Sequence, residues 1–447
     1  ELNSLAADAS IRVRLQAVVT LGTTSAPSAL DTVIAIAERD ADSPWVTEAV
    51  LASPRFDANR FLDALAKGRG RWLRDPSSSQ LEFLQQLAAR IAATGARDSL
   101  DACIGTALNA QDEAATLALL QGVASEPSGR KRLLSPPTDL AASLRPALAS
   151  LPSRLLATTV DAQKQAVVRS RAVTLLAALR SPVLSSKLTD LLVADQPLEV
   201  QTAAARALGS VGTPEIADAV LAGWDALALR TRHVLLGALS GRGDLAARLV
   251  NAVKRGSIAA VELDPATRDA LLRLPDAALR ESLASLLKTP QQTDRRQVVS
   301  RFEPALALEA NPTRGRDLFR RHCQTCHTRG NEGNRVGPEL LSVAGKPPAE
   351  LLVAILDPNR EVSPDGQSVV VATNSGQTLT GLIIEESSAA LRLRRAEGLE
   401  DLLPRSTVEA VRPTGKSLMP EGFEQLLAGQ DLADLIAYLR TTTDPQR

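Results

Sequence analysis

The residues best suited to chemistry lie together at Cys323-Gln324-Thr325-Cys326-His327. C-x-x-C-H is the attachment signature of a c-type haem, in which two thiols form thioethers with the vinyl groups and the imidazole binds the iron. The spacing lets both sulfurs reach one porphyrin edge from a single helical turn. A zinc site would need three or four ligands, and only His322 is another cysteine or histidine nearby. The motif therefore predicts one covalently bound haem c, with His327 as the proximal iron ligand.

Met419 is the only methionine of the chain, and it lies in the segment Lys416-Ser417-Leu418-Met419-Pro420-Glu421-Gly422. A thioether is a weak neutral ligand, so a turn must present it to the iron, and Pro420 and Gly422 are typical turn residues. Iron with one histidine and one methionine ligand has a raised reduction potential. We expect Met419 to be the second axial ligand; the alternative is that it fills a gap in the core.

Two helices are predicted on either side of these ligands. Gly315-x-x-x-Phe319 lies on a short helix beginning near Pro312, and residues 431–440 carry the apolar stripe of a terminal helix that includes Tyr438. The arrangement resembles cytochromes c of the His/Met class, in which the first and last helices cross at a contact between a glycine and an aromatic residue. The resemblance implies that Gly315, Phe319 and Tyr438 form this crossing.

The segment Val336-Gly337-Pro338-Glu339-Leu340 follows the predicted haem loop. In the same class of cytochromes a proline carbonyl accepts the Nδ1–H of the proximal histidine, which fixes the ring and its basicity. The resemblance assigns this role to Pro338. We also count Gly337 and Leu340, with Phe319 and Tyr438, among the residues expected to line the cofactor.

Residues 367–412 alternate apolar and polar side chains with a period of two, and Asn374-Ser375-Gly376 is a turn signal between two such runs. We predict a β-rich insert of about four short strands inside the cytochrome. It follows an apolar run at 351–356 that ends as a helix at Asp357-Pro358-Asn359-Arg360.

These motifs together resemble the Pirellula/Verrucomicrobium-type haem-binding domain, which is found at the C-terminus of large dehydrogenase-like proteins. The resemblance covers residues 310–442. It is carried by Gly315-x-x-x-Phe319, Cys323–His327, Val336-Gly337-Pro338, Ile355–Arg360, Thr380-Gly381 and Ser417–Gly422.

The remaining sequence is rich in Ala and Leu and shows a weak repeat. Asp8…Val13-Arg14-x-x-Ala17-x-x-x-Leu21 recurs from Asp195 to Leu208, and a third copy spans 168–176. A period near 34 residues in an all-helical sequence predicts a solenoid. Because the aromatic pattern of tetratricopeptide repeats is missing, we expect short HEAT-like repeats, which also resemble the segment that commonly precedes this haem domain.

The predicted fold is therefore mainly α: a HEAT-like helical repeat domain at 1–290, a linker or docking segment at 291–311, and a His/Met cytochrome c domain at 312–442. Lys plus Arg equals Asp plus Glu, at 51 each, so no basic footprint suggests nucleic acid. No run reaches the ~18 apolar residues of a membrane span.

The sequence leaves the enzymatic status open, because we find no catalytic residues beyond the haem. The leading hypothesis is electron transfer to or from a redox partner protein, with the helical repeats as scaffold and docking surface. The alternatives are the haem-bearing C-terminal part of a larger sugar- or alcohol-type dehydrogenase, or an interaction scaffold with a structural haem. Covalent haem is normally attached outside the cytoplasm, so we expect a periplasmic or other extracytoplasmic location and a leader or larger N-terminal part before residue 1.

Six arginines lie between residues 314 and 339. They predict either a positive field that steers an acidic partner or pairing with nearby acids and the haem propionates. The six are Arg314, Arg316, Arg320, Arg321, Arg329 and Arg335.

Overall fold

The chain is mainly helical (62%), and its small β-sheets lie in the C-terminal part, which confirms the mainly α class; the solenoid and the cytochrome fold stay predictions. Contacts between Cα atoms divide it into two compact units, residues 1–191 with 199–213 and residues 192–198 with 214–447. The computed structural model describes residues 2–23, 28–53, 57–68, 71–135, 139, 141–287, 292–396 and 398–442.

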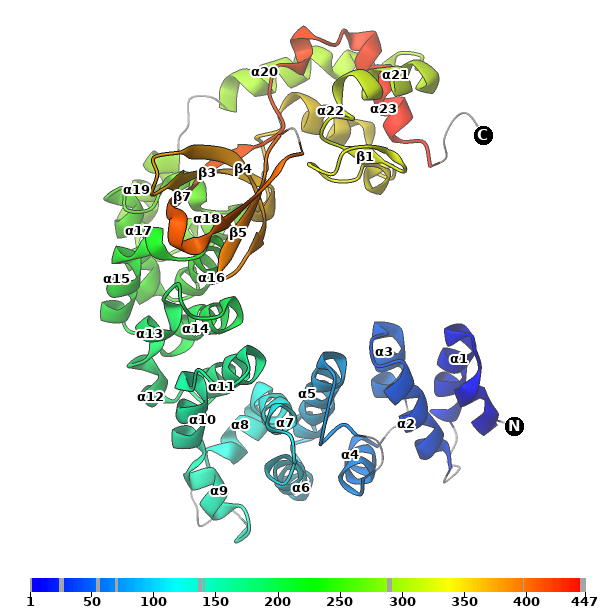
Figure 1. Cartoon of the computed structure of the whole chain (residues 1–447), viewed down its shortest axis with the longest axis vertical. Helices are drawn as coiled ribbons and strands as arrows, with labels where there is room; N and C mark the ends of the chain where they lie inside the picture. The colour runs from blue at the N-terminus through cyan, green and yellow to red at the C-terminus, as the bar shows by residue number, and fades with distance from the viewer. Residues whose placement is uncertain are drawn as a thin grey trace. The chain divides into compact units, whose positions relative to one another are not determined.

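The first unit contains only helices among its described residues. Neighbouring helices pack in succession, with α5 against α7, α7 against α11 and α10 against α11 (Figure 1). The helices are η1 (Leu2–Ala7), α1 (Ile11–Leu21), α2 (Ala29–Arg39), α3 (Pro44–Ala52), α4 (Ala58–Ala66), α5 (Ser78–Ala93), α6 (Arg97–Leu108), α7 (Glu113–Ser125), α8 (Pro127–Leu133), α9 (Arg145–Ala149), α10 (Leu151–Val160), α11 (Ala166–Ala178), α12 (Pro182–Ser185), α13 (Leu188–Leu192) and α14 (Leu198–Val211).

The three sequence repeats fall on three of these helices, α1, α11 and α14. Their shared alanine position is buried in each helix, as is the leucine one turn later. Two copies also share a buried arginine that bonds to the chain before its own helix: Arg14 Nη1 donates to Asp8 O (2.6 Å), and Arg169 Nε donates to Thr159 O (2.9 Å). The repeat therefore marks equivalent buried helices, while their HEAT-like classification stays a prediction.

The second unit begins with further helices and continues into the region around the C-x-x-C-H motif. The predicted boundary near residue 290 falls at residues 288–291, which lie outside the described residues, and the stretch that follows carries a helix, α20. The elements before the large sheet are α15 (Pro214–Ala222), η3 (Trp224–Ala226), α16 (Leu229–Ser240), α17 (Gly243–Lys254), η4 (Ala260–Glu262), α18 (Pro265–Leu272), α19 (Ala277–Leu287), α20 (Gln292–Phe302), η5 (Glu303–Ala307), α21 (Pro312–His322), β1 (Thr328–Arg329), β2 (Glu332–Gly333), η6 (Leu340–Val343) and α22 (Pro348–Leu356).

The larger sheet has five antiparallel strands in the order β6-β5-β4-β3-β7, where the sequence predicted about four. The strand missed is β6, an edge strand with no buried residue, so it lacks the apolar alternation that identified the others. The last strand also continues beyond residue 412. The remaining elements are η7 (Pro364–Gly366), β3 (Gln367–Thr373), β4 (Thr378–Glu386), β5 (Ala390–Arg394), β6 (Glu400–Pro404), η8 (Arg405–Thr407), β7 (Val408–Ser417), η9 (Phe423–Gln425) and α23 (Gly429–Leu439).

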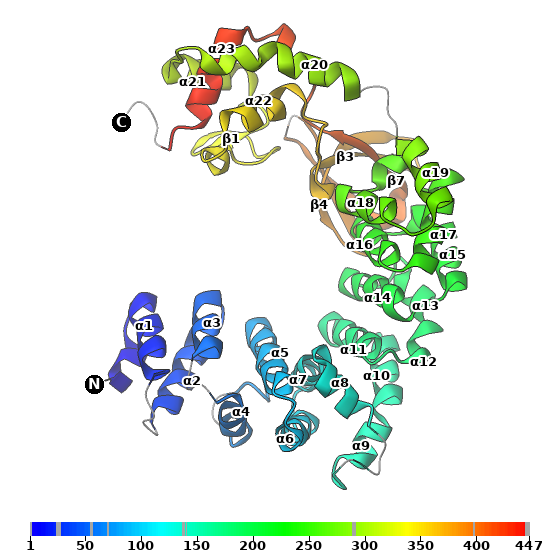
Figure 2. The ribbon, with the colours of Figure 1, turned by 180° about the vertical axis from the view of Figure 1, so that it is seen from behind.

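The sheet shares a core with the helices that precede it in the second unit. Leu229 at the start of α16 packs with the buried sheet residues Val369, Val371, Leu391 and Val411. Figure 2 shows the sheet beside α16 and α18 from behind, with β7 next to the helices. One face of the sheet is therefore covered by helices, as its alternating burial requires.

A separate core holds together the helices around the motif. It contains Phe319 of α21, Leu352 of α22, and Leu435 and Tyr438 of α23. The predicted helices thus exist at the expected places: one begins at Pro312, one ends just before Asp357, and one covers most of 431–440.

Candidate functional site

The C-x-x-C-H motif forms one tight turn at the end of α21. Cys323 caps the helix and its N–H donates to Phe319 O (2.8 Å), while the N–H groups of Cys326 and His327 donate to Cys323 O (3.1 and 2.9 Å). Burial, with a smaller contribution from Cys326, raises the pKa of the Cys323 thiol to about 12. The turn brings the two sulfurs and the imidazole onto one short stretch of backbone.

The imidazole of His327 is held on one side by the segment that follows the loop. Its Nδ1 lies 2.8 Å from Pro338 O. A Cβ on Gly337 would lie only 2.4 Å from the ring Cε1, so the ring packs directly against glycine backbone. Since a carbonyl can only accept, Nδ1 carries the proton and Nε2 is the nitrogen left to bind a metal.

The loop between the motif and Pro338 folds back on the motif. The N–H groups of Val336 and Gly337 both donate to Cys326 O (2.9 and 2.6 Å). Gly333 has φ +92°, and a Cβ there would lie 2.0 Å from His327 O, so this position suits glycine alone. These contacts fix the position of the imidazole relative to the two cysteines.

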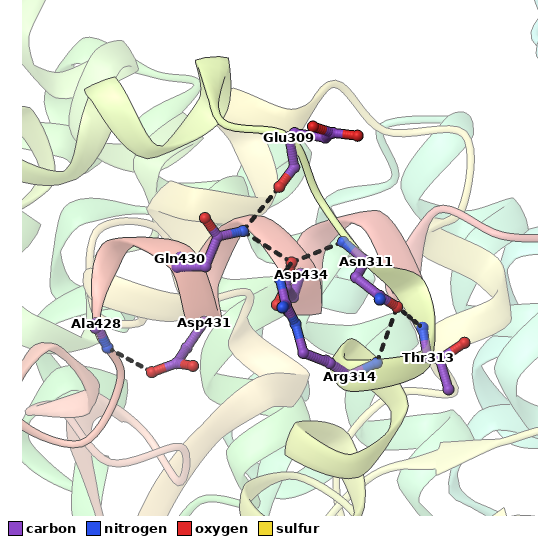
Figure 3. Close-up of polar contacts among 8 residues, drawn as sticks. All are labelled: Glu309, Asn311, Thr313, Arg314, Ala428, Gln430, Asp431 and Asp434. Carbon is purple, nitrogen blue, oxygen red and sulfur yellow. Dashed lines mark hydrogen bonds and ion pairs between the residues drawn. The ribbon is translucent and has the colours of Figure 1, made fainter.

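Figure 3 shows how α21 and α23 are joined at the N-terminal end of α21. Asp434, which is 1% exposed, accepts hydrogen bonds from Arg314 Nε (2.6 Å), Asn311 N (2.7 Å) and Gln430 Nε2 (3.0 Å). Burial alone would raise the pKa of Asp434, but these hydrogen bonds outweigh it and hold the pKa below its usual value. The sequence did not indicate this residue, although it lies one turn before Tyr438 on the same face of α23.

The helices also meet at the predicted glycine. A Cβ on Gly315 would lie 2.1 Å from Asp434 O and 2.7 Å from the Cβ of Tyr438. The rings of Phe319 and Tyr438 have centroids 5.8 Å apart. The structure thus brings these three residues together, and Leu340 packs half-buried against the same core.

Met419 follows β7 in an irregular segment. Its side chain is half-buried and packs on the core that contains Phe319 and Tyr438, and Cys323 packs on that core as well. The Met419 N–H donates to Ser417 Oγ (3.1 Å). The thioether and the attachment cysteine therefore border one common core, although ligation by Met419 stays a prediction.

The loop between β5 and β6 lies against the attachment loop, which the sequence did not indicate. Ala396 O is 3.5 Å from Cys326 Sγ, and Arg394 Nη1 donates to Arg335 O (2.5 Å). The loop after β5 therefore contacts the motif at its second cysteine.

Three of the six arginines near the motif are paired with acids. Arg316 and Arg320 both bind Glu332 (2.7 and 2.6 Å), and Arg314 binds Asp434. Arg329 is 6% exposed and lies over the Tyr438 ring at 4.2 Å. For these residues the structure favours pairing and packing over a free positive field.

Residues 310–373 match the family model of subunit III of cbb3-type cytochrome c oxidase. This stretch is a c-type cytochrome domain, which implies haem c and electron transfer through it. A comparison with curated proteins finds no match. The matched residues include the C-x-x-C-H turn and Pro338, whereas Met419 and Tyr438 lie beyond them.

The residues present fit a haem. The turn offers two thiols and an imidazole whose Nε2 is left free by the bond of Nδ1 to Pro338 O, and the half-buried Met419, on the core that Cys323 also borders, carries a thioether. Cys323 and Cys326 would hold the porphyrin, and His327 and Met419 would hold the iron. The helices of the described residues are too short or too polar to cross a membrane.

Proposed function

We propose that the chain is an electron-transfer module carrying one haem c, attached through Cys323 and Cys326 and ligated by His327 and Met419. The observation that carries the proposal is the hydrogen bond from His327 Nδ1 to Pro338 O (2.8 Å) within a C-x-x-C-H turn. It fixes the ring and its tautomer, and it raises the basicity of the nitrogen that would face the iron. A haem bound here would supply reversible one-electron chemistry.

The protein's own residues would keep that exchange fast and specific. The Gly337 backbone holds the imidazole from one side, and Met419 and Cys323 both pack on the core of α21, α22 and α23. A fixed ligand set changes little between two oxidation states, and exclusion of water and the axial ligands together set the potential. We infer that the helical repeats act as scaffold and docking surface for a redox protein or dehydrogenase domain, outside the cytoplasm.

The ligand assignment is tested by Met419→Ala. We expect the ferric protein to show the weak near-infrared band of a thioether–iron bond and the variant to lose it. The variant should also have a lower midpoint potential, because the methionine ligand that raises the potential is removed. The measurements are ferric absorption spectra and a reversible redox titration.

The matched control is Leu426→Ala, a 63% exposed apolar residue of the same region, which should keep the band and the potential. A band that survives in Met419→Ala would refute Met419 as the ligand. Haem that is lost on denaturation would refute attachment through the two cysteines.

A further inference from the structure

The segment from Ser417 to Glu424, here called the Met loop, is bridged by one side chain from elsewhere in the fold. Asn359 lies in the turn after α22. Its Oδ1 accepts the Ser417 N–H (2.8 Å), and its Nδ2 donates to Glu421 Oε1 (2.6 Å). The two bonds reach the chain two residues before and two residues after Met419.

An amide side chain can make both bonds at once, because it carries an acceptor oxygen and a donor NH₂ group. The backbone N–H of Ser417 needs an acceptor, and the carboxylate of Glu421 needs a donor. These opposite demands also fix which way the amide faces. An aspartate at residue 359 would lose the donor, and an alanine would lose both contacts.

The turn that carries Asn359 is itself held in place. Asp357, which is 8% exposed, pairs with Arg360 (3.0 Å) across the turn. Arg295 of α20 bonds to Leu356 O at the end of α22 and forms an ion pair with Glu424 (2.7 Å) at the far end of the Met loop. Asn359 therefore projects from a turn that is closed by its own ion pair and whose start is bonded to α20.

We propose that Asn359 is a positioning residue that holds Met419 on the iron. The inference rests on the proposed ligation by Met419. A thioether is a weak ligand that competes with water and added bases, so the free energy needed to order the Met loop opposes the iron–sulfur bond. By closing the loop across Met419 in advance, Asn359 reduces that cost.

The test is Asn359→Ala in the full haem-loaded chain, read by the binding of added imidazole to the ferric iron. Imidazole must displace the methionine, so we expect its apparent affinity to rise about tenfold, the scale of a net hydrogen bond or two. The thioether–iron band should weaken. Glu421→Gln keeps an acceptor for Asn359 and should stay close to wild type.

Asn374→Ala is the matched control, because Asn374 Nδ2 also bonds to a distant backbone carbonyl, that of Ser406 (2.8 Å), but in the β3–β4 hairpin. It should leave imidazole affinity unchanged. If Asn359→Ala fails to fold, Glu421→Ala removes one of the same two bonds and is expected to raise the affinity severalfold.

The outcomes separate the two proposals. If Met419→Ala abolishes the band while Asn359→Ala and Glu421→Ala bind imidazole as the wild type does, the positioning role is wrong and the ligand assignment stands. If Met419→Ala leaves the band unchanged, the ligand assignment fails and the role of Asn359 fails with it.

Discussion

Single residues at this site act mainly by allowing or preventing close approach. The His327 ring lies on Gly337, the His327 carbonyl faces Gly333, and the Asp434 carbonyl faces Gly315. In each case a methyl group would occupy space already filled by the neighbour. Glycine is used here for contact distance, and only Gly333 needs its positive φ as well.

Gly315→Ala should therefore destabilise the folded state. The added Cβ would lie 2.1 Å from Asp434 O, and neither helix can move without breaking the bonds of Arg314 and Asn311 to Asp434, so we expect a loss of about 2–3 kcal/mol. Thermal or denaturant unfolding measures it. Gly429→Ala is the control, because its Cβ would meet Ala305 at an ordinary 3.6 Å; equal stability of the two variants would contradict the crossing.

The sequence predicted the residues of the site whose signals are local or shared with a known class of protein. The C-x-x-C-H spacing identified Cys323, Cys326 and His327. The contacts of Pro338 and Gly315 were predicted from the resemblance. Asn359 and Asp434 were missed as polar partners because each one bonds to groups 58 or more positions away. Such pairings depend on which elements pack together, and no period or spacing shows that.

The same distinction holds for whole elements. β3, β4, β5 and β7 were visible because each places apolar residues of an alternating pattern in the sheet core, whereas the edge strand β6 has no buried residue and only Leu403 packs partly against that core. The helices that carry the site were predicted within two or three residues of their ends, since Pro312 and Pro358 mark boundaries that proline chemistry imposes.

At the scale of elements, Glu332 joins the β1–β2 hairpin to α21. Hydrogen bonds from Arg320 and Arg316 lower the pKa of Glu332 to about 2, from 4.5. The stabilisation is complete above pH 4.5 and is lost as the pH falls toward 2, because protonation removes the charge that the arginines bind. Since the pair is partly solvated, we expect about 1–2 kcal/mol at neutral pH.

Glu332→Gln should remove this pH-dependent stabilisation, so that the unfolding free energies of variant and wild type converge below pH 3. Denaturant unfolding between pH 2 and pH 7 measures it. Glu385→Gln breaks a more exposed pair with Arg392 and should change stability by less than about 0.5 kcal/mol. A constant gap between Glu332→Gln and wild type across this pH range would contradict the assigned cause.

At the scale of the whole molecule, net charge provides little long-range attraction for a partner. Positive and negative residues balance at 51 each, and the arginines nearest the motif are largely paired or buried. A partner that bound at the attachment loop would therefore have to be recognised by shape and apolar contact more than by long-range charge. A partner bound at this loop would also contact the β5–β6 hairpin, which lies against Cys326.

The second unit is joined internally through Arg232 of α16, which is 1% exposed. Its guanidinium donates to Val411 O of β7 (3.0 Å) and to Asp225 O (2.8 Å) and lies 3.5 Å from Glu262. It stands at the start of a helix much as Arg14 and Arg169 do, but one of its bonds goes to the sheet. Beside it, Glu386 of β4 accepts the N–H groups of Leu229 and Arg230 at the N-terminus of α16 (3.2 and 3.3 Å), where a carboxylate is favoured.

Arg232→Met should therefore weaken the sheet and the helices together. It leaves buried carbonyls without donors, each costing about 1–3 kcal/mol, so we expect a loss of at least about 3 kcal/mol in unfolding free energy. Hydrogen exchange of the full chain should be faster in β7 and in α16 to the same extent, because Arg232 belongs to α16 and bonds to β7. Arg248→Met, which breaks a half-exposed pair with Asp218, should change exchange in neither α16 nor β7. Faster exchange in α16 with β7 still protected would contradict the shared role of Arg232. It would show that the helices and the strand leading to Met419 respond independently.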